Sequence, residues 1–386
     1  MKDLKPLKIL FISMNSIHAI RWIENLDRKD YEIYWFDVLN RGKLEKLSFA
    51  TQFYGMNKRK IPYLKGEYFL YKKLPFLYNY IIKYLEVTPN EALDKIIKEI
   101  QPDIVHSFEM QSCSYPILKT MQKYSEMKWV YSCWGSDLYY YKDFKEHRYR
   151  LRNVLKRVDY LLADCNRDFE IAKEIGFKGR FLGVIPGGGG YHLEDILSYK
   201  YAIANRKLIL IKGYQHTFGR ALNVLKAIED IYLHYPDFEF VVFGAHNETI
   251  SYIEEKKMPF KVYQRNELSH IELLKLMGKS LVYIGNSISD GIPNTLLEAI
   301  VMGAFPIQTN PGNATSEIIQ DGINGLLIQD AENIEEIKLK IIKALDNGSL
   351  INQARIYNDN LALERLDYQK NRIRINAFYN TIMKCE

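Results

Sequence analysis

The residues from 281 to 328 constrain the fold more than any other part of the chain. Residues 281–284 are apolar and β-prone, which predicts a short buried strand. A loop over 285–292 follows, and then an apolar stripe with helical spacing that Gly303 ends. Residues 305–308 predict the next strand. A strand, a loop, a helix and a second strand in this order form the repeating unit of a parallel α/β sheet.

The loop and the first helical turn hold the residues with the most chemistry. Pro293 suits the first turn of a helix, whose leading amides have no helical partner. Those amides are Asn294, Thr295 and Leu296. The helix dipole adds partial positive charge, so this end attracts a phosphate or a carboxylate. Asp290 and Gly291 precede the helix, and Glu298 shares a helix face with Asn294. The alternative is an ordinary connection in which Asp290 caps the helix.

Three ordered runs in this region carry a resemblance to a known family. They read S-x-S-D-G-I-P-N-x-L-L-E-A, then G-A-F-P-I, then G-N-x-x-S-E-I-I-x-D-G-x-N-G-L-L. Together they resemble the C-terminal signature of the retaining glycosyltransferases of family 4, the group 1 glycosyltransferases. The usual acidic pair of that family is Glu, seven residues, Glu, and this chain has Asp290 and Glu298 at that spacing. The resemblance implies the GT-B fold, an α/β architecture of two doubly wound, Rossmann-like parallel-sheet domains facing across a cleft.

The resemblance also implies a role for each residue of the signature. Glu298 would bind the ribose hydroxyls of a nucleotide-sugar donor, and Asp290 would be a catalytic residue that contacts the donor sugar. Gly291 and the amides of the first helical turn would lie near the phosphates. Aspartate in place of glutamate shortens the reach by one methylene, so the donor sugar stays open, with UDP- or GDP-linked sugars expected.

The length of 386 residues predicts two domains with separate cores. We expect an N-terminal acceptor-binding domain over 1–195 and a C-terminal nucleotide-sugar-binding domain over 206–366. A final helix over 367–386 would, in this fold, cross back to the first domain. A four-glycine loop over 187–190 precedes the linker, and it either lets the backbone approach a ligand or is simply flexible.

Composition excludes several classes of function. A net charge of +6 is too mild to imply nucleic acid as a partner, and the four cysteines have no paired spacing. The N-terminus lacks the apolar core of a signal peptide, and no apolar run approaches the roughly 18 residues that cross a bilayer. We therefore expect a cytoplasmic protein in a reducing compartment.

A diphosphate donor needs positive charge because the diphosphate gathers negative charge as it leaves. No two aspartates are two residues apart, so we expect no metal and no cofactor, and the charge would fall to basic side chains and helix N-termini. Lys212 and Arg220 bracket the first loop of the second half. Their order is altered relative to the family, which leaves their division of roles open. Arg265, at a strand end, is expected to contact the base.

Four residues of the first half are further candidates. His18 and Arg21 lie where the family places its first loop and are expected to bind the acceptor, although His18 alternatively caps a helix or lies on the surface. His106 ends a predicted strand, and Asp137 follows another, in a W-G-S-D run that resembles a segment of this family. Both are candidate catalytic residues, and the alternative for Asp137 is capping the next helix.

Residues 56–85 differ from the rest because basic and aromatic side chains alternate there. The basic ones are Lys58, Arg59, Lys60, Lys65, Lys72, Lys73 and Lys83. They face only Glu67, and several tyrosines and phenylalanines lie among them. Such a surface suits an anionic membrane, at the inner face of the cell membrane in this case. The alternative is a solvated helical face in a chain rich in lysine and tyrosine.

The sequence therefore predicts a retaining, metal-independent hexosyltransferase. It would move a sugar from a nucleotide donor to a lipid-linked or surface-polysaccharide acceptor. Two alternatives stay open, namely a GT-B nucleotide-sugar epimerase that needs no acceptor and a non-catalytic partner subunit docked on a membrane. Isomerised sugar formed from donor without acceptor would identify the epimerase. Thermal stabilisation of the protein by the donor would argue against the non-catalytic subunit.

Overall fold

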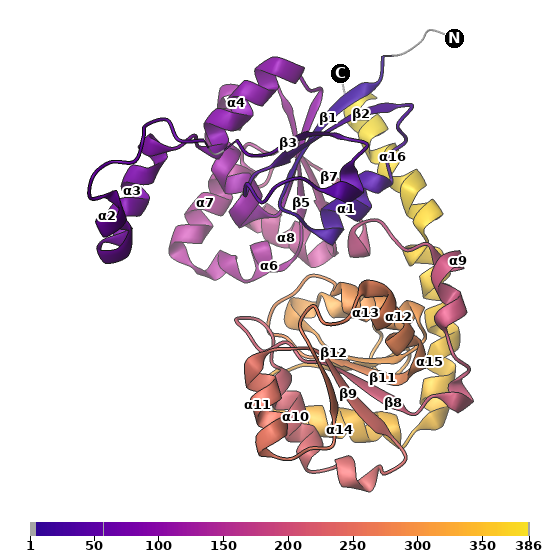
Figure 1. The fold of residues 1–386 in the computed structure, drawn as a ribbon. Helices are drawn as coiled ribbons and strands as arrows, with labels where there is room; N and C mark the ends of the chain where they lie inside the picture. The colour runs from indigo at the N-terminus through magenta and orange to yellow at the C-terminus, as the bar shows by residue number, and fades with distance from the viewer. Residues whose placement is uncertain (1–4, 57, 385–386) are drawn as a thin grey trace. The chain divides into compact units, whose positions relative to one another are not determined.

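The structure is a computed structural model that describes residues 5–56 and 58–384, and these form two compact units (Figure 1). The first unit runs to Leu162 and takes in Phe169–Gly183. The second comprises Ala163–Asp168 and the chain from Val184 onward. Each unit is built on one sheet with helices packed against it, so two doubly wound α/β units, as predicted, are confirmed.

The first unit holds a seven-stranded sheet with the order β3-β2-β1-β4-β5-β6-β7. Its strands are β1 Leu7–Ser13, β2 Tyr31–Asp37, β3 Thr51–Phe53, β4 Ile104–Phe108, β5 Lys128–Cys133, β6 Tyr160–Ala163 and β7 Arg180–Val184. The pairings of β1 with β2 and β4 are parallel. The apolar run at the centre of β1 is completely buried, as expected of a strand covered on both faces. The strand order reverses between β1 and β4.

Eight α-helices belong to the described residues of this part of the chain. They are α1 Ile17–Glu24, α2 Glu67–Lys73, α3 Pro75–Leu85, α4 Pro89–Ile100, α5 Leu118–Lys123, α6 Ser136–Tyr139, α7 Lys145–Leu155 and α8 Asn166–Ile175. A short turn at Tyr141–Asp143 precedes α7. Phe144, between them, is extended with ψ of 120°, which interrupts the helix.

The second unit holds a six-stranded sheet with the order β10-β9-β8-β11-β12-β13. Its strands are β8 Leu208–Lys212, β9 Glu239–Ala245, β10 Lys261–Gln264, β11 Ser280–Gly285, β12 Phe305–Thr309 and β13 Leu326–Ile328. All of its neighbouring strands pair in parallel. The order reverses between β8 and β11, so the crevice beyond their carboxyl ends is the expected ligand site of this sheet.

The remaining α-helices follow Val184. They are α9 Leu193–Ile196, α10 Ala221–Glu229, α11 Asn247–Glu255, α12 His270–Lys279, α13 Asn294–Val301, α14 Ile334–Leu345, α15 Gly348–Leu361 and α16 Tyr368–Lys384. Ser269 caps α12 and forms a capping box with Glu272. Pro293 is the N-cap of α13 rather than its first helical residue, with extended ψ of 127°. Between the four-glycine loop and β8, the chain contains α9 and short turns.

Candidate functional site

In the second unit, the loops that follow β8 and β11 are bonded to each other. The Ile288 amide donates to the Phe218 carbonyl at 2.9 Å, and Arg220 N donates to the Asn286 carbonyl at 3.0 Å. Asn286 Nδ2 returns the contact by donating to the Arg220 carbonyl. The two loops are therefore fixed against each other where the strand order reverses.

Asp290 lies in the loop after β11, four residues before α13 begins. Its side chain is half-buried, and this desolvation raises the pKa of the carboxyl group. The charge of Lys212 acts in the opposite direction, as do the charge of Arg167 and the Gly291 amide, which donates to Oδ1 at 3.0 Å. A partly desolvated carboxyl group beside cations, at the ligand-binding edge of a sheet, is a candidate functional group.

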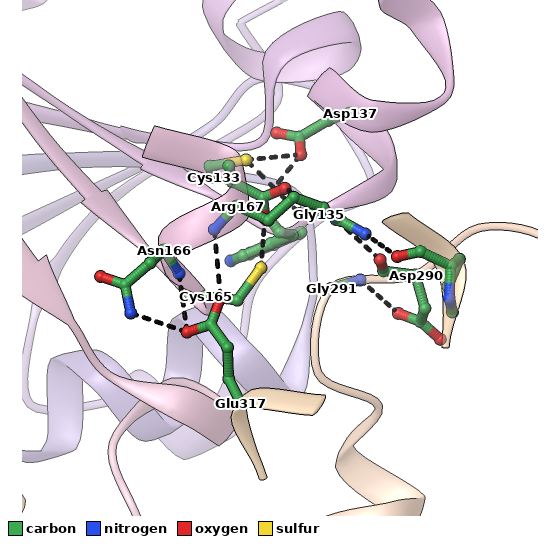
Figure 2. A network of polar contacts seen from close by, with 12 residues as sticks. Cys133, Gly135, Asp137, Cys165, Asn166, Arg167, Asp290, Gly291 and Glu317 are labelled. Carbon is green, nitrogen blue, oxygen red and sulfur yellow. Dashed lines mark hydrogen bonds and ion pairs between the residues drawn. The ribbon is translucent and has the colours of Figure 1, made fainter. Parts of the chain in front are cut away.

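Arg167 holds the backbone of the Asp290 loop (Figure 2). Its Nη2 donates to the Asp290 carbonyl at 2.8 Å, and its Nη1 donates to the Pro311 carbonyl at 2.7 Å. Nε and Nη2 also bond Asp168, and the Arg167 side chain is buried. One guanidinium group therefore connects the loop after β11 to the loop after β12.

Glu317 in turn positions Arg167, as Figure 2 shows. Its Oε2 accepts from both the backbone N and the Nδ2 of Asn166, at 2.9 and 2.7 Å. Its Oε1 accepts from the Arg167 amide at 3.1 Å. These amides open α8 and would otherwise have no helical partner, so the carboxylate satisfies them.

The structure separates the roles of Lys212 and Arg220. Lys212 ends β8, and its Nζ lies 4.7 Å from the centre of the Tyr214 ring. It forms no ion pair within the described part of the chain, and its charge acts on Asp290. Arg220 forms an ion pair with Glu332 at 2.5 Å, and its Nη1 donates to three carbonyls of its own loop. Arg220 therefore stabilises the loop after β8, and Lys212 is the cation that remains available to bind an anion.

Arg265 lies with Lys212 around one aromatic ring. It is exposed, it directly follows β10, and its guanidinium carbon lies 5.8 Å from the centre of the Tyr214 ring. Tyr214 stacks on His246, with ring centres 5.5 Å apart. The structure therefore brings Arg265 into the same cluster as Lys212, as a second cation at the carboxyl edge.

The first turn of α13 differs in one respect from the expectation. The Leu296 amide donates to the Pro293 carbonyl at 3.0 Å, so it is not free, and the expected anion contact of Leu296 is corrected. This bond forms because Pro293 is the N-cap of α13 and its carbonyl accepts from the first turn of the helix. Thr295 Oγ1 lies 2.8 Å from the Tyr283 hydroxyl, and Asn294 Oδ1 accepts from the Tyr191 hydroxyl at 3.3 Å.

The four-glycine loop packs against this same turn. Gly187 to Gly190 are buried and all have positive φ, between 70° and 126°. A Cβ atom at Gly187 would come within 3.0 Å of Leu297 Cδ1 and 3.2 Å of Asn294 Oδ1. At Gly190 it would come within 2.8 Å of Asn371 Nδ2. Burial and close packing do not fit a flexible linker.

Glu298 lies on α13 and is almost completely buried. One of its carboxylate oxygens lies 2.9 Å from His270 Nε2, at the first residue of α12. The His270 side chain is about half exposed, so it bridges the buried carboxylate and solvent. Sequence reasoning singled out Glu298 but missed His270, and the available signal was its place directly after the capping Ser269.

In the first unit, His106 is inside the sheet and completely buried. Its Nε2 lies 2.8 Å from Ser132 Oγ, and its ring stacks on Phe108 with centres 4.4 Å apart. Burial lowers the pKa of His106 to about 3, so the imidazole is neutral. This is a core histidine, and the expectation of a catalytic His106 is corrected on that ground.

Asp137 is also buried. Its carboxylate contacts neighbouring residues of its own segment, as Figure 2 shows for Cys133. Its carboxylate accepts from the Tyr131 hydroxyl at 2.6 Å, from Cys133 Sγ at 3.1 Å and from the Trp134 amide at 3.0 Å. These bonds hold the turn between β5 and α6, and they differ from the helix cap that the sequence left open, because Gly135 is the N-cap of α6 and Asp137 lies inside the helix. The expectation of a catalytic Asp137 is replaced by this structural role.

Glu109 is a functional candidate that sequence reasoning missed. It directly follows β4 and has a positive φ of 64°, which is uncommon for a residue with a side chain. Its carboxylate accepts from the amides of Gln111 and Ser112 at 2.9 and 2.6 Å. Burial, with the charge of Asp137, raises the pKa of Glu109 to about 7. The available signal was its position at a strand end, three residues after His106.

His18 and Arg21 lie on α1, which follows β1, and both are half-buried. The His18 ring lies 5.2 Å from the Trp134 ring, centre to centre. Because β1 and β4 flank the reversal of strand order, the segments that carry His18 and Glu109 follow the two strands at the ligand-binding edge of this sheet. Arg21 lies one helical turn further along α1.

Over residues 5–56 and 58–384, no group of three histidine, cysteine, aspartate or glutamate side chains is arranged to hold a metal ion. Lys212, Arg167 and the N-terminus of α13 supply positive charge near Asp290. The arrangement can therefore hold an anion next to a partly desolvated carboxyl group.

Two family models match the chain. The model for the glycosyl transferases group 1 matches residues 205–360, and the model for the glycosyl transferase 4-like proteins matches residues 8–165. An uncharacterised glycosyltransferase of Methanocaldococcus jannaschii is 26% identical over 217 residues. The match covers 54% of this chain and 54% of that relative, so the chain spans about half the length of the curated relative it matches.

Solved structures share the fold. Sucrose-phosphate synthase from Thermosynechococcus elongatus has a TM-score of 0.72 and 12% identity, covering 99% of this chain and all of that one. Anabaena HepE in complex with UDP and glucose has a TM-score of 0.68 and 12% identity, covering 97% and 99%. A glycosyltransferase from Rickettsia africae has a TM-score of 0.66 and 16% identity, covering 99% and 100%. With the two parallel sheets, these likenesses identify the fold as GT-B, as the sequence predicts.

Proposed function

The chain belongs to the group 1, family 4-like glycosyltransferases, and from that premise we propose that it transfers a sugar, with retention, from a nucleoside-diphosphate donor. The proposed acceptor is lipid-linked or part of a surface polysaccharide. We propose further that the reaction needs no metal ion and takes place at the inner face of the cell membrane.

One observation carries the proposal, namely the setting of Asp290. A half-buried carboxyl group with a raised pKa faces the charge of Lys212 and immediately precedes α13, at the edge where the strand order of the second unit reverses. A cation and a helix N-terminus stabilise the negative charge of a diphosphate. The sugar carbon gains positive charge as its bond to the diphosphate breaks. A cation and a carboxylate within one loop cluster suit those two opposite charges.

In the proposed reaction, the bond between the sugar C1 and the diphosphate oxygen breaks, and the acceptor hydroxyl oxygen bonds to C1. The hydroxyl proton leaves with the departing phosphate oxygen. Lys212 stabilises the negative charge of the leaving diphosphate, together with the dipole of α13. Asp290 stabilises the positive charge that develops on the sugar. Gly291 follows Asp290 in the same loop, and Thr295 lies in the first turn of α13. The phosphates are proposed to bind at these two residues.

Glu298 is proposed to bind the ribose hydroxyls. A buried carboxylate already bonded to His270 is held in one orientation, which favours two parallel bonds to neighbouring hydroxyls. His270 would then position Glu298 and contact solvent or ribose with its exposed edge. Arg265 is proposed to contact the base, next to Tyr214.

The donor nucleotide is proposed to be uridine or guanosine diphosphate. Structures of Anabaena HepE contain UDP, or UDP-glucose, so a UDP-sugar is the first donor to test. The acceptor is proposed to bind the first unit near His18, Arg21 and Glu109. With a pKa of about 7, Glu109 is partly ionised at neutral pH, so it is proposed to accept a hydrogen bond from the acceptor hydroxyl and orient it, while the hydroxyl proton goes to the departing phosphate oxygen.

The testing experiment measures thermal stability with UDP, GDP and their sugar conjugates. A nucleotide at 100 times its Kd adds about 2.7 kcal/mol to the unfolding free energy, which is readily measured. Donor that stabilises the protein is then incubated with lipid-linked and polysaccharide acceptors, and the anomeric configuration of the product is determined. Isomerised donor without acceptor would instead identify an epimerase, and no response to any nucleotide would favour a non-catalytic subunit.

A further inference from the structure

Helices α2 and α3 form a hairpin that stands out from the sheet of the first unit (Figure 1). We define the hairpin as residues 58–86. A helix in water is normally stabilised by burying one apolar face. Between residues 58 and 86, Leu85 is the only hydrophobic side chain that is buried, and four more are half-buried, namely Leu70, Tyr78, Ile81 and Ile82. The hairpin helices therefore bury little apolar surface.

The hairpin concentrates exposed hydrophobic side chains. Eleven of the twenty-five large hydrophobic side chains that are exposed in the described chain lie between residues 61 and 84. Phe76 is 89% exposed, Tyr63 79% and Tyr68 73%. Single exposed hydrophobic residues are normal, but a cluster of this density marks a surface that binds another apolar phase.

A polar clamp, rather than an apolar core, holds the hairpin in shape. Arg59 bonds both carboxylate oxygens of Glu67, at 2.6 and 2.8 Å, and holds the pKa of Glu67 at about 2. Glu67 also accepts from the Leu64 amide at 3.1 Å and the Tyr78 hydroxyl at 3.3 Å. The exposed aromatic rings are therefore carried on a folded hairpin and not on a loose segment.

The hairpin also carries most of the net charge of the protein. Its seven lysine and arginine residues face two glutamates, so it contributes five of the six net positive charges. Lysine ammonium groups lie over the exposed rings, with Lys83 Nζ 4.0 Å from the Tyr80 ring centre and Lys72 Nζ 5.6 Å from that of Tyr71. Cations and aromatic rings thus share one surface.

We propose that this hairpin docks the protein on an anionic lipid bilayer, with its aromatic rings in the headgroup region and its lysines against the lipid phosphates. Tyrosine rings suit that depth because they have an apolar body and a polar end. Lysine is depleted at protein–protein interfaces but attracted to anionic membranes. The exposed Lys65, Lys72, Lys73 and Lys83 therefore favour lipid over a protein partner. No described helix is long and apolar enough to span the membrane.

Vesicle binding without donor or acceptor tests the inference, using neutral phosphatidylcholine vesicles and vesicles containing phosphatidylserine. We expect binding to the anionic vesicles that weakens with salt. K72E/K73E is expected to lower the partition coefficient at least 20-fold, since each lost charge is worth about five-fold. K178E/K257E reverses two exposed lysines elsewhere and is the matched control. Absence of binding in the wild type, or equal losses in both variants, overturns the proposal.

Insertion is tested through the apolar side chains. F69S/F76S is expected to abolish most vesicle binding at low salt. L233S, at a leucine of the second unit whose exposure lies between those of Phe69 and Phe76, leaves it unchanged. F76W is expected to show blue-shifted emission with anionic vesicles and quenching by brominated lipid. Emission that stays unshifted, or hairpin-dependent self-association in sedimentation without lipid, contradicts membrane docking.

These variants change exposed side chains, so an unchanged melting temperature confirms that they fold. Nucleotide-dependent stabilisation of F69S/F76S should equal that of the wild type. Loss of vesicle binding with intact nucleotide binding therefore tests only the docking role of the hairpin. Absence of nucleotide binding in every variant would count only against the proposed glycosyltransferase function.

Discussion

Glu298 and His270 are 28 residues apart in the sequence, and the Glu298 carboxylate lies 2.9 Å from His270 Nε2. The pair joins the first residue of α12 to the middle of α13, and Glu298 is buried while His270 reaches solvent. A carboxylate held in this way loses little conformational freedom when a ligand binds.

The first prediction concerns this pair. Glu298→Gln should weaken nucleoside-diphosphate binding roughly 10- to 100-fold, the usual value of a bond to a charged group, with a smaller effect on kcat. His270→Gln should weaken binding less, and the double variant should show coupling when Kd is measured by calorimetry. Glu255→Gln, at an exposed glutamate of α11, is the control. Additive effects would show that His270 does not position Glu298.

A second prediction concerns Asp290, whose pKa is raised by desolvation. A raised pKa in the folded state means that stability decreases as pH rises through the range between the unfolded and folded values. Asp290→Asn should therefore raise the melting temperature at pH 7 relative to the wild type, while kcat falls about 10²- to 10³-fold and nucleotide affinity changes little. Asp290→Glu should keep partial activity. A melting temperature lowered by Asp290→Asn would identify a structural helix cap instead.

The two cations of the β8 loop should behave differently. Lys212→Gln should weaken diphosphate binding, and it should move the acidic limb of the kcat–pH profile to higher pH because the charge that lowers the Asp290 pKa is lost. Arg220→Gln should instead lower the melting temperature, since it breaks the Glu332 ion pair and leaves three carbonyls without their donor. If Lys212→Gln lowered the melting temperature and Arg220→Gln weakened diphosphate binding, the roles assigned to the two residues would be reversed.

Arg167 is expected to act as a positioning residue. Arg167→Ala removes the donors to the Asp290 and Pro311 carbonyls, so kcat should fall by at least ten-fold with little change in nucleotide Kd. The acidic limb of the kcat–pH profile should again move to higher pH, which a purely structural role would not produce. Arg41→Ala, at an exposed arginine, is the control. An unchanged pH profile would contradict the assignment.

Turnover should survive chelation. We expect donor binding and product formation to continue in EDTA, because Lys212 and the N-terminus of α13 supply the positive charge. The measurement is the initial rate with and without EDTA after removal of trace metals. Complete loss that manganese or magnesium restores would require a metal-dependent mechanism.

Much of the architecture was predictable because it follows from local patterns. The strand at β11 is a short apolar run bounded by a loop, the helix after Asp290 has apolar side chains at helical spacing, and Ser269 with Glu272 carries the signature of a capped helix. Phe144 was not predictable in the same way. Its extended backbone interrupts a run whose composition favours one continuous helix.

The site was predictable only where its residues share one segment of sequence. Asp290 and Glu298 lie within one loop–helix unit, so their spacing was visible. Arg167 and Glu317 meet through tertiary structure across about 150 residues of chain, and no local pattern reports such a contact. His106 illustrates the opposite error, because it lies in the middle of β4 rather than at its end, with its side chain completely buried.

The four glycines at 187–190 have a consequence for large-scale mutagenesis. Each has a positive φ, and side chains at Gly187 and Gly190 would press into Leu297 and Asn371. In a saturation scan, these positions would tolerate substitution as poorly as Asp290, although they carry no reactive group. A ranking of residues by their intolerance of substitution would therefore not distinguish residues needed for the fold from residues needed for the reaction in this region. A scan that scores abundance and turnover separately would divide them, with the glycines losing both and Asp290 losing turnover alone.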